Sequence, residues 1–269
     1  MTASSTFVSS SGDGYELQMG RWSRRLAEPF LDFCGWRDGE TILDAGCGTG
    51  SLTFALAQRA KTASIEGVDF SAAYIAHATQ RNHDARIKFR VGDICALPFE
   101  DASFDRVLSL LVLHFVPRSA DAVAELRRVA RPGATVAAAV WDARGGYVAG
   151  RMFFDAAATL DQNGNDRRAK NFTRPMTRPG ELASAWRRAG FVNVRDTMLT
   201  IRMEFASFDD YWAPYTGKDG PAAEYVATLD PMQKERLREL LRAAYLDGEA
   251  DGPRSYAATA WAVAGTAPA

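Results

Sequence analysis

The 269-residue sequence lacks the features that define several common classes of protein. Its three cysteines, Cys34, Cys47 and Cys95, are too few and too irregularly spaced for a disulfide framework or a zinc site, so we expect buried thiols and no metal. No apolar run approaches the roughly 20 residues of a membrane span. Residues 1–14 are rich in Ser, Thr and Gly and show no signal-peptide pattern. These absences predict a cytoplasmic protein in a reducing compartment.

An excess of charge of either sign is also missing. The 32 basic and 33 acidic residues nearly cancel, so no overall field attracts nucleic acid or an anionic membrane. We therefore expect neither nucleic acid nor a membrane as a partner. With 47% hydrophobic residues the chain can form a sizeable core on its own, and its state as a monomer or a homodimer stays open.

What the sequence does contain is a short apolar run that ends in three closely spaced glycines. Residues 42–45 lead into Gly46, Gly48 and Gly50. Glycines allow a tight turn and let backbone N–H groups approach a ligand closely. The apolar spacing of residues 51–57 predicts a helix directly after the turn. The stretch therefore predicts a nucleotide-type site at the end of a strand.

A second strand, predicted at residues 65–69, ends in Asp69. An acidic residue roughly 20 positions after such glycines can accept hydrogen bonds from both hydroxyls of a ribose. The glycine spacing disfavours a dinucleotide, because G-x-G-x-x-G/A begun at Gly46 requires Gly or Ala where the chain has Ser51. A nicotinamide-dependent oxidoreductase and a non-catalytic protein that binds a nucleotide-type ligand remain as alternatives.

Two motifs resemble those of a known family. Residues 43–50, Leu-Asp-Ala-Gly-Cys-Gly-Thr-Gly, resemble the first motif of class I S-adenosylmethionine-dependent methyltransferases of the methyltransferase domain 11 type, and residues 67–71, Gly-Val-Asp-Phe-Ser, resemble their ribose-binding motif. Residues 126–133 match the family's Leu-Arg-Arg-Val-x-Arg-Pro-Gly turn. The resemblance implies methyl transfer from S-adenosyl-L-methionine, which becomes S-adenosyl-L-homocysteine, to an oxygen, nitrogen or carbon of an aromatic or lipophilic small molecule.

The same resemblance assigns the cofactor-binding residues. An acidic residue and its hydrophobic neighbour hold the adenine in the family, and Asp93 and Ile94 occupy those positions, although an Asx-turn is the alternative for Asp93. An aromatic and a basic residue of an N-terminal lid lie near the cofactor, which points to Tyr15 and Arg21, unless both merely pack on the surface. The other expected cofactor-binding residues are Met19, Asp44, Gly46, Cys47, Gly48, Asp69, Phe70 and Leu110.

Alternating strand and helix patterns predict the fold class. Strands are expected at residues 42–45, 65–69, 87–91, 103–116 and 134–142, with helices from 71 to about 81 and over 120–129. Such a succession predicts an α/β protein with a Rossmann-like, doubly wound, mostly parallel sheet and helices on both faces. A sixth strand near 198–205 and a seventh over 256–264, antiparallel if the family topology holds, make the sheet seven-stranded.

We expect a single domain with four parts. These are a flexible N-terminus (1–14), an N-terminal lid helix region (15–36), an S-adenosylmethionine-binding core (37–145), and residues 146–269, which complete the sheet and carry a helical C-terminal insertion that caps the substrate. Within the last part, the polar residues 163–170 predict a loop, and residues 231–246 predict an amphipathic helix.

His114 is the candidate general base, because it lies at the carboxyl end of the fourth predicted strand, the edge where open α/β sheets bind ligands. A capping or packing histidine is the alternative, and Asp142 at the end of the fifth predicted strand is a weaker candidate acid. Six aromatic residues are expected either to line an apolar acceptor site or to pack in the core: Trp141, Tyr147, Phe153, Phe154, Tyr211 and Trp212.

Overall fold

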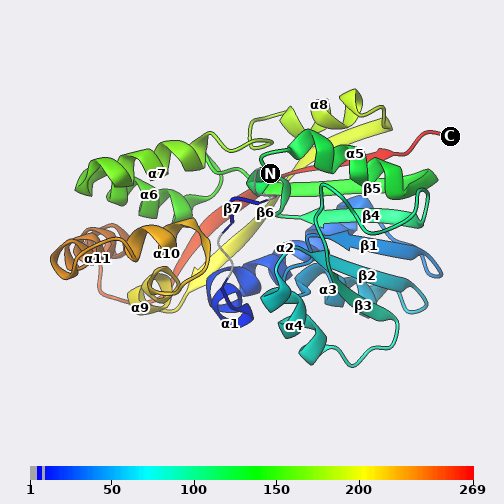
Figure 1. Cartoon of the computed structure of the whole chain (residues 1–269). Coiled ribbons are helices and arrows are strands. Elements are labelled where there is room, and N and C mark those ends of the chain that lie inside the picture. The colour runs from blue at the N-terminus through cyan, green and yellow to red at the C-terminus, as the bar shows by residue number, and fades with distance from the viewer. Residues whose placement is uncertain (1–4, 8–9) are drawn as a thin grey trace.

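The computed structural model describes residues 5–7 and 10–269 (Figure 1). Its strands are β1 (Thr41–Ala45), β2 (Ser64–Asp69), β3 (Ile87–Val91), β4 (Phe104–Leu110), β5 (Ala130–Trp141), β6 (Val192–Phe205) and β7 (Arg254–Thr266). Its α-helices are α1 (Gly12–Tyr15), α2 (Arg21–Cys34), α3 (Ser51–Arg59), α4 (Ala72–Arg81), α5 (Ser119–Val129), α6 (Val148–Leu160), α7 (Gln162–Phe172), α8 (Glu181–Arg188), α9 (Phe208–Trp212), α10 (Gly220–Val226) and α11 (Pro231–Leu246). Short π- and 3₁₀-helical turns are η1 (Glu16–Gly20), η2 (Leu113–Phe115) and η3 (Ala213–Thr216).

The strands form one seven-stranded sheet in the order β3-β2-β1-β4-β5-β7-β6. Strands β1 to β5 pair in parallel, whereas β7 runs antiparallel to both β5 and β6. The predicted α/β class, with a mostly parallel seven-stranded sheet, is confirmed. Because parallel strands end at the same edge, the segments that follow β1 to β5 meet there.

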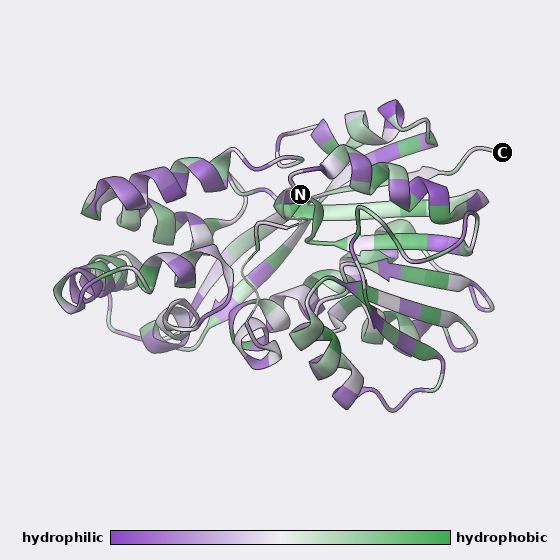
Figure 2. Cartoon of the chain, in the orientation of Figure 1, coloured by the Kyte–Doolittle hydropathy of each residue, from purple (hydrophilic) through white to green (hydrophobic). Residues whose placement is uncertain are grey.

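Helices cover both faces of the sheet because the strands alternate their side chains between two apolar layers. Ile42 of β1 packs in the layer with α2 and α3, and its neighbour Leu43 packs in the layer with α5 and α8. Trp186 of α8 is fully buried, and its indole N–H donates to the carbonyl oxygen of Val136 in β5 at 3.0 Å. Hydrophobic residues accordingly dominate the strands of the sheet in Figure 2. This double burial explains the near-continuous apolar runs of the central strands.

The N-terminal region is more regular than we expected. Residues 12–34 are helical throughout, since α1 continues through the π-helical turn η1 into α2, so the last residues of the expected flexible N-terminus (1–14) are already helical. The start is fixed by Ser11, whose hydroxyl accepts from the Gly14 N–H at 3.0 Å, and by Asp219, which accepts from the Ser10 N–H at 2.6 Å. Residues 1–4 and 8–9 of the expected flexible terminus lie outside the described residues.

A helical cap forms the other end of the molecule. Strands β6 and β7 extend past the parallel strands, and helices α6, α7, α9, α10 and α11 gather around this extension (Figure 1). The predicted loop at 163–170 is wrong, because these residues belong to helix α7. Its sequence has no apolar stripe, and Figure 2 shows it largely hydrophilic. Capping and tertiary contacts stabilise it instead: the Asp161 carboxylate accepts from the Gly164 N–H at 2.6 Å, and Arg167 pairs with Glu224 at 2.8 Å.

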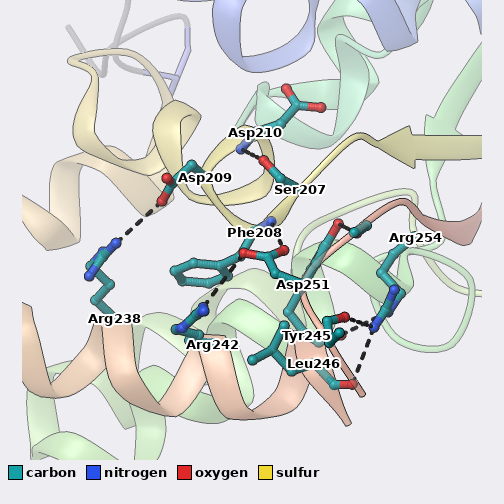
Figure 3. Close-up of polar contacts among 12 residues, drawn as sticks. Ser207, Phe208, Asp209, Asp210, Arg238, Arg242, Tyr245, Leu246, Asp251 and Arg254 are labelled. Carbon is teal, nitrogen blue, oxygen red and sulfur yellow. Dashed lines mark hydrogen bonds and ion pairs between the residues drawn. The ribbon is translucent and has the colours of Figure 1, made fainter. Parts of the chain in front are cut away.

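Polar contacts connect the cap helices to the start of β7 and to the loop before it, as Figure 3 shows. The Arg254 guanidinium donates to the carbonyl oxygens of Tyr245 and Leu246, at 3.2 and 3.3 Å, and so satisfies the carboxyl end of α11. Asp251 accepts from the Phe208 N–H at the start of α9, at 2.9 Å. The predicted amphipathic helix at 231–246 is confirmed as α11.

The largest differences between predicted and observed strand boundaries are at β4 and β6. Strand β4 ends at Leu110, and the rest of the apolar run turns into η2, so His114 lies on a 3₁₀-helical turn after the strand. Strand β6 begins at Val192, earlier than the predicted 198. Among the described residues, no helix is long and apolar enough to cross a bilayer.

Candidate functional site

A large cavity lies at the carboxyl edge of the parallel strands, and we call it the central cavity. It contains about 1120 Å³ of empty space, part of it open to solvent. Its walls come from the turns after β1 to β5, the N-terminal helix, and the cap.

The glycine turn after β1 forms the floor of the cavity. Gly46, Gly48 and Gly50 have φ values of +81°, +56° and +90°, which side chains with a Cβ rarely adopt. A Cβ on Gly46 would lie 2.3 Å from a methyl carbon of Val112, so the close approach of the β4 loop also requires glycine. Gly46 and Gly48 both line the cavity, whereas Cys47 is buried behind them.

Asp69 ends β2 beside this turn and also lines the cavity. Its two carboxylate oxygens accept from the N–H groups of Gly48 and Ser71, each at 2.9 Å. Each oxygen has a further lone pair, so the same carboxylate can still accept from two ligand hydroxyls. Burial raises the pKa of Asp69 above its usual value, while the two backbone N–H groups oppose that shift. Its neighbour Phe70 is exposed toward the cavity.

Asp44 lies behind the glycine turn and does not line the cavity. Its side chain is 1% exposed; Oδ2 accepts from the Thr53 hydroxyl at 2.6 Å, and Oδ1 has no hydrogen-bond partner among the described residues. Burial raises its pKa to about 7, and the nearby charge of Asp69 adds to the shift. A buried carboxylate oxygen without a partner is costly, which indicates that a bound group completes this site.

Asp93 and Ile94, after β3, line the cavity next to Asp69. Asp93 forms the Asx-turn that we considered as an alternative, since Oδ1 accepts from the Cys95 N–H at 2.8 Å. Oδ2 lies 3.8 Å from Arg118, a weak contact that leaves it available to a ligand. Leu110, at the end of β4, is a further predicted residue in the lining.

The N-terminal helical segment forms one wall of the cavity, to which α1 contributes Tyr15 and η1 contributes Met19. The Tyr15 hydroxyl and the Ser23 hydroxyl lie 2.9 Å apart, and burial raises the pKa of Tyr15 to about 12. Arg21 does not reach the lining. Its guanidinium pairs with Asp210 at 3.0 Å and lies 4.3 Å from the Trp22 ring centroid, so it connects the N-terminal helix to the cap.

The far side of the cavity is aromatic and contains His114. The His114 side chain is buried, its ring centroid lies 4.1 Å from that of Phe115, and Nδ1 has no hydrogen-bond partner among the described residues. Burial, aided by the positive charge of Arg174, holds the pKa of His114 well below its usual 6.5. The imidazole is therefore neutral and can accept a proton or a hydrogen bond.

Three of the six predicted aromatic residues line this side: Trp141, Tyr147 and Phe154. Trp141 and Tyr147 stack with ring centroids 5.5 Å apart. The other three pack in the core of the cap; Phe153 stacks on Tyr215, for example, and the Tyr211 hydroxyl donates to the carbonyl oxygen of Ala149 at 3.0 Å. Asp142 accepts from the N–H groups of Arg144 and Gly145 at 3.1 Å, as a turn-forming residue does.

Several lining residues were not identified from the sequence: Phe7, Gln18, Tyr74, Phe115 and Asn171. Each is brought in by tertiary structure rather than by a motif. Asn171 belongs to α7, the segment that we took for a loop, so no periodicity marked it.

Comparison with known proteins agrees with this geometry. Residues 43–138 match the sequence profile of the family described as "Methyltransferase domain". The resemblance to class I methyltransferases is therefore confirmed. The fold is also shared with the S-adenosyl-L-methionine complex of phosphoethanolamine N-methyltransferase 2 from Haemonchus contortus, at a TM-score of 0.59 and 16% identity, over 97% of this chain and 61% of that chain.

Curated relatives share the same core. The ubiquinone/menaquinone biosynthesis C-methyltransferase UbiE of Paracoccus denitrificans is 34% identical over 122 residues, which are 44% of this chain and 49% of that protein. A malonyl-[acyl-carrier protein] O-methyltransferase of Erwinia pyrifoliae is 38% identical over 119 residues, which are 44% of each chain. The match thus spans about half the length of these relatives, whose names differ in the acceptor atom.

Proposed function

We propose that this protein transfers a methyl group from S-adenosyl-L-methionine to a small-molecule acceptor. The observation that carries the proposal is the central cavity itself. It joins the glycine turn, Asp69 and Asp93 on one side to His114 and an aromatic wall on the other. The methyltransferase domain match over residues 43–138 covers the glycine turn, both acids and His114, and so supports the same function.

The residues present fit the cofactor. In the proposal the turn at Gly46 and Gly48 faces its methionine part, Asp69 binds the ribose hydroxyls, and Asp93 with Ile94 holds the adenine. Phe70, Leu110, Tyr15 and Met19 supply apolar contacts around it. The unpartnered Oδ1 of Asp44 is suited to an ammonium group beyond the turn. Arg21 and Cys47, outside the lining, are assigned a supporting role only.

When bound, S-adenosylmethionine supplies an electrophilic methyl group on a positively charged sulfur. The chain's own contribution is to hold the acceptor in line and to exclude water, and proximity of this kind is worth roughly 7–11 kcal/mol of the barrier. His114 is the proposed general base for an acceptor that must lose a proton, a role worth about 10²–10⁴-fold in rate.

The proposal includes a cytoplasmic location and a monomeric or homodimeric state. Cys34, Cys47 and Cys95 are all free and buried, which suits a reducing compartment.

Calorimetric titration of the purified protein with S-adenosylmethionine, S-adenosylhomocysteine, NAD and NADP tests the proposal. We expect micromolar binding of the first two and none of the dinucleotides. Binding of NAD instead would indicate the oxidoreductase alternative. Cofactor binding without methyl transfer to any phenol, amine or lipophilic acid would indicate a non-catalytic binding protein.

A further inference from the structure

Part of the central cavity has a largely aromatic lining, and we call this part the acceptor chamber. It is defined by His114 and Phe115 of η2, Trp141 at the end of β5, Tyr147 just before α6, Phe154 of α6, and Asn171 of α7. Flat aromatic walls of this kind suit a ring-shaped ligand.

The two halves of the cavity differ in charge. The carboxylates among its described lining residues are Asp69 and Asp93, and both belong to the cofactor half. In the described part of the chain, the acceptor chamber has no acidic, lysine or arginine side chain in its lining. An ammonium group would therefore enter this chamber without a counter-charge, which is costly in a buried site.

A positive charge lies directly behind the chamber. Arg174 is 8% exposed, and its guanidinium carbon is 4.4 Å from the centroid of the Phe115 ring. Among the described residues no carboxylate forms an ion pair with Arg174, although Glu224 lies near enough to raise its pKa slightly. Burial lowers the pKa of Arg174 to about 10, so the group stays charged at neutral pH. A buried, uncompensated cation favours a negative charge nearby.

Arg174 also orients Asn171. Its Nε donates to Asn171 Oδ1 at 3.0 Å, and both side chains are buried. Because a guanidinium can only donate, the amide oxygen must face Arg174, and the NH₂ group is the part of Asn171 left to donate to a ligand. The contact thus places the positive charge of Arg174 directly behind a hydrogen-bond donor in the wall of the chamber.

Two more polar atoms of the chamber have no partner among the described residues. These are His114 Nδ1 and Trp141 Nε1, both on side chains that are 4% exposed. The neutral imidazole can accept a hydrogen bond, and the indole N–H can only donate. The chamber therefore offers one acceptor and two donors on an apolar, aromatic background.

We propose that the acceptor is an uncharged ring compound with an acidic hydroxyl group, a phenol or an enol, whose oxygen binds between His114 and Asn171. The proposal rests on the methyl transfer proposed above and names its substrate class. The hydroxyl donates to His114 and accepts from the Asn171 amide, while Arg174 stabilises the ionised oxygen. On ionisation the O–H bond breaks, its electron pair stays on the oxygen, and the proton passes through His114 to solvent. Arg174 is a positioning residue in this scheme.

A coloured probe tests the proposal without turnover. 4-Nitrophenol, whose absorbance reports its ionisation, is titrated with pH while bound to the protein saturated with S-adenosylhomocysteine. We expect the pKa of the bound probe to fall by about one unit or more, because a nearby opposite charge lowers the pKa of an acid by about 1–3 units. Phenolate would then bind about tenfold more tightly than phenol. 4-Nitrobenzylamine, an ammonium ion of similar size, should bind at least about tenfold more weakly than 4-nitrophenol.

Two variants separate this role from simple packing. Arg174→Gln removes the charge, and Asn171→Asp places a carboxylate beside Arg174 that cancels it. In both we expect the pKa shift of the bound probe to disappear. Arg195→Gln is the matched control, because Arg195 also lies 4.4 Å from a phenylalanine ring, that of Phe33, but away from the cavity lining. It should leave the shift unchanged. Circular dichroism and S-adenosylhomocysteine affinity report whether each variant is folded.

The outcomes distinguish this proposal from the one on which it rests. Failure of S-adenosylhomocysteine to bind the wild-type protein would overturn the proposed function. If the cofactor binds normally, any of three results would overturn the substrate class alone. These are an unshifted pKa of the bound probe, a shift that stays intact in Arg174→Gln, and an amine that binds as tightly as the phenol.

Discussion

The two halves of the central cavity are built in different ways. In the cofactor half, the polar binding residues and the glycine turn stand at or directly after strand ends: the glycines after β1, Asp69 at the end of β2, and Asp93 after β3. In the acceptor chamber, the walls come from η2, the end of β5, and the cap helices α6 and α7. The first half depends on local backbone geometry, and the second depends on how the cap packs against the sheet.

This difference implies that the two halves respond to different perturbations. Changes in the glycine turn should abolish cofactor binding, and changes in the cap should affect the acceptor chamber while the cofactor half stays intact. The predictions below test this separation, beginning with the largest expected effect.

Gly46→Val should reduce the affinity for S-adenosylhomocysteine by about 100-fold or more, measured by calorimetry. The backbone has φ +81°, where a side chain costs about 1–2 kcal/mol, and the added Cβ would lie 2.3 Å from Val112. Gly133→Val is the control, since Gly133 has φ +82° with no atom within 4 Å of an added Cβ. It should lower stability through strain but retain cofactor binding. Similar losses of affinity in both variants would contradict the steric argument.

Asp69→Ala should weaken cofactor binding by about 1–3 kcal/mol, or roughly 5- to 150-fold, because the ribose hydroxyls and two backbone N–H groups lose their acceptor. Asp105→Ala is matched to it, because Asp105 also accepts a backbone N–H, from Thr41 at 2.8 Å, but lies outside the cavity lining. We expect that variant to bind normally. Unchanged affinity in a folded Asp69→Ala variant would remove Asp69 from the site.

Gly164→Val tests the cap. An added Cβ would lie 2.0 Å from the carbonyl oxygen of Ala157, so α7 must move away from α6. We expect a loss of about 1–3 kcal/mol in the free energy of unfolding, with weaker binding of 4-nitrophenol and little change for S-adenosylhomocysteine. The control is Gly252→Val, where an added Cβ meets no atom within 4 Å. Equal losses for both ligands in Gly164→Val would show that the halves are not independent.

The smallest effect concerns pH. The folded pKa of His114 lies well below its usual 6.5, so at acid pH the unfolded chain binds a proton that the folded chain does not. Stability is therefore lost as pH falls below about 6.5, by at most about 1.4 kcal/mol per pH unit. His114→Asn should flatten this slope in urea unfolding between about pH 7 and pH 5. His83→Asn, at an exposed histidine, should keep it.

The same division explains what could be predicted from the sequence. The cofactor half was accessible because apolar periodicity locates β1 to β3, and glycine and acid chemistry at their ends is local. The residues of the acceptor chamber could be predicted from the sequence only in part. His114 follows β4 and Trp141 ends β5, whereas Asn171 and Arg174 depend on α7, a polar helix that capping and ion pairs stabilise without an apolar stripe. Arg21 was predicted to bind the cofactor from its place in the N-terminal lid, but its guanidinium pairs with Asp210 of the cap instead.

A crystal structure of the protein with S-adenosylhomocysteine would show directly which part of the cavity holds the cofactor. We expect the ribose at Asp69, the adenine beside Asp93 and Ile94, and the sulfur facing the chamber formed by His114 and Trp141. A ligand whose sulfur faces solvent, or that occupies the acceptor chamber itself, would contradict the assignment of the two halves.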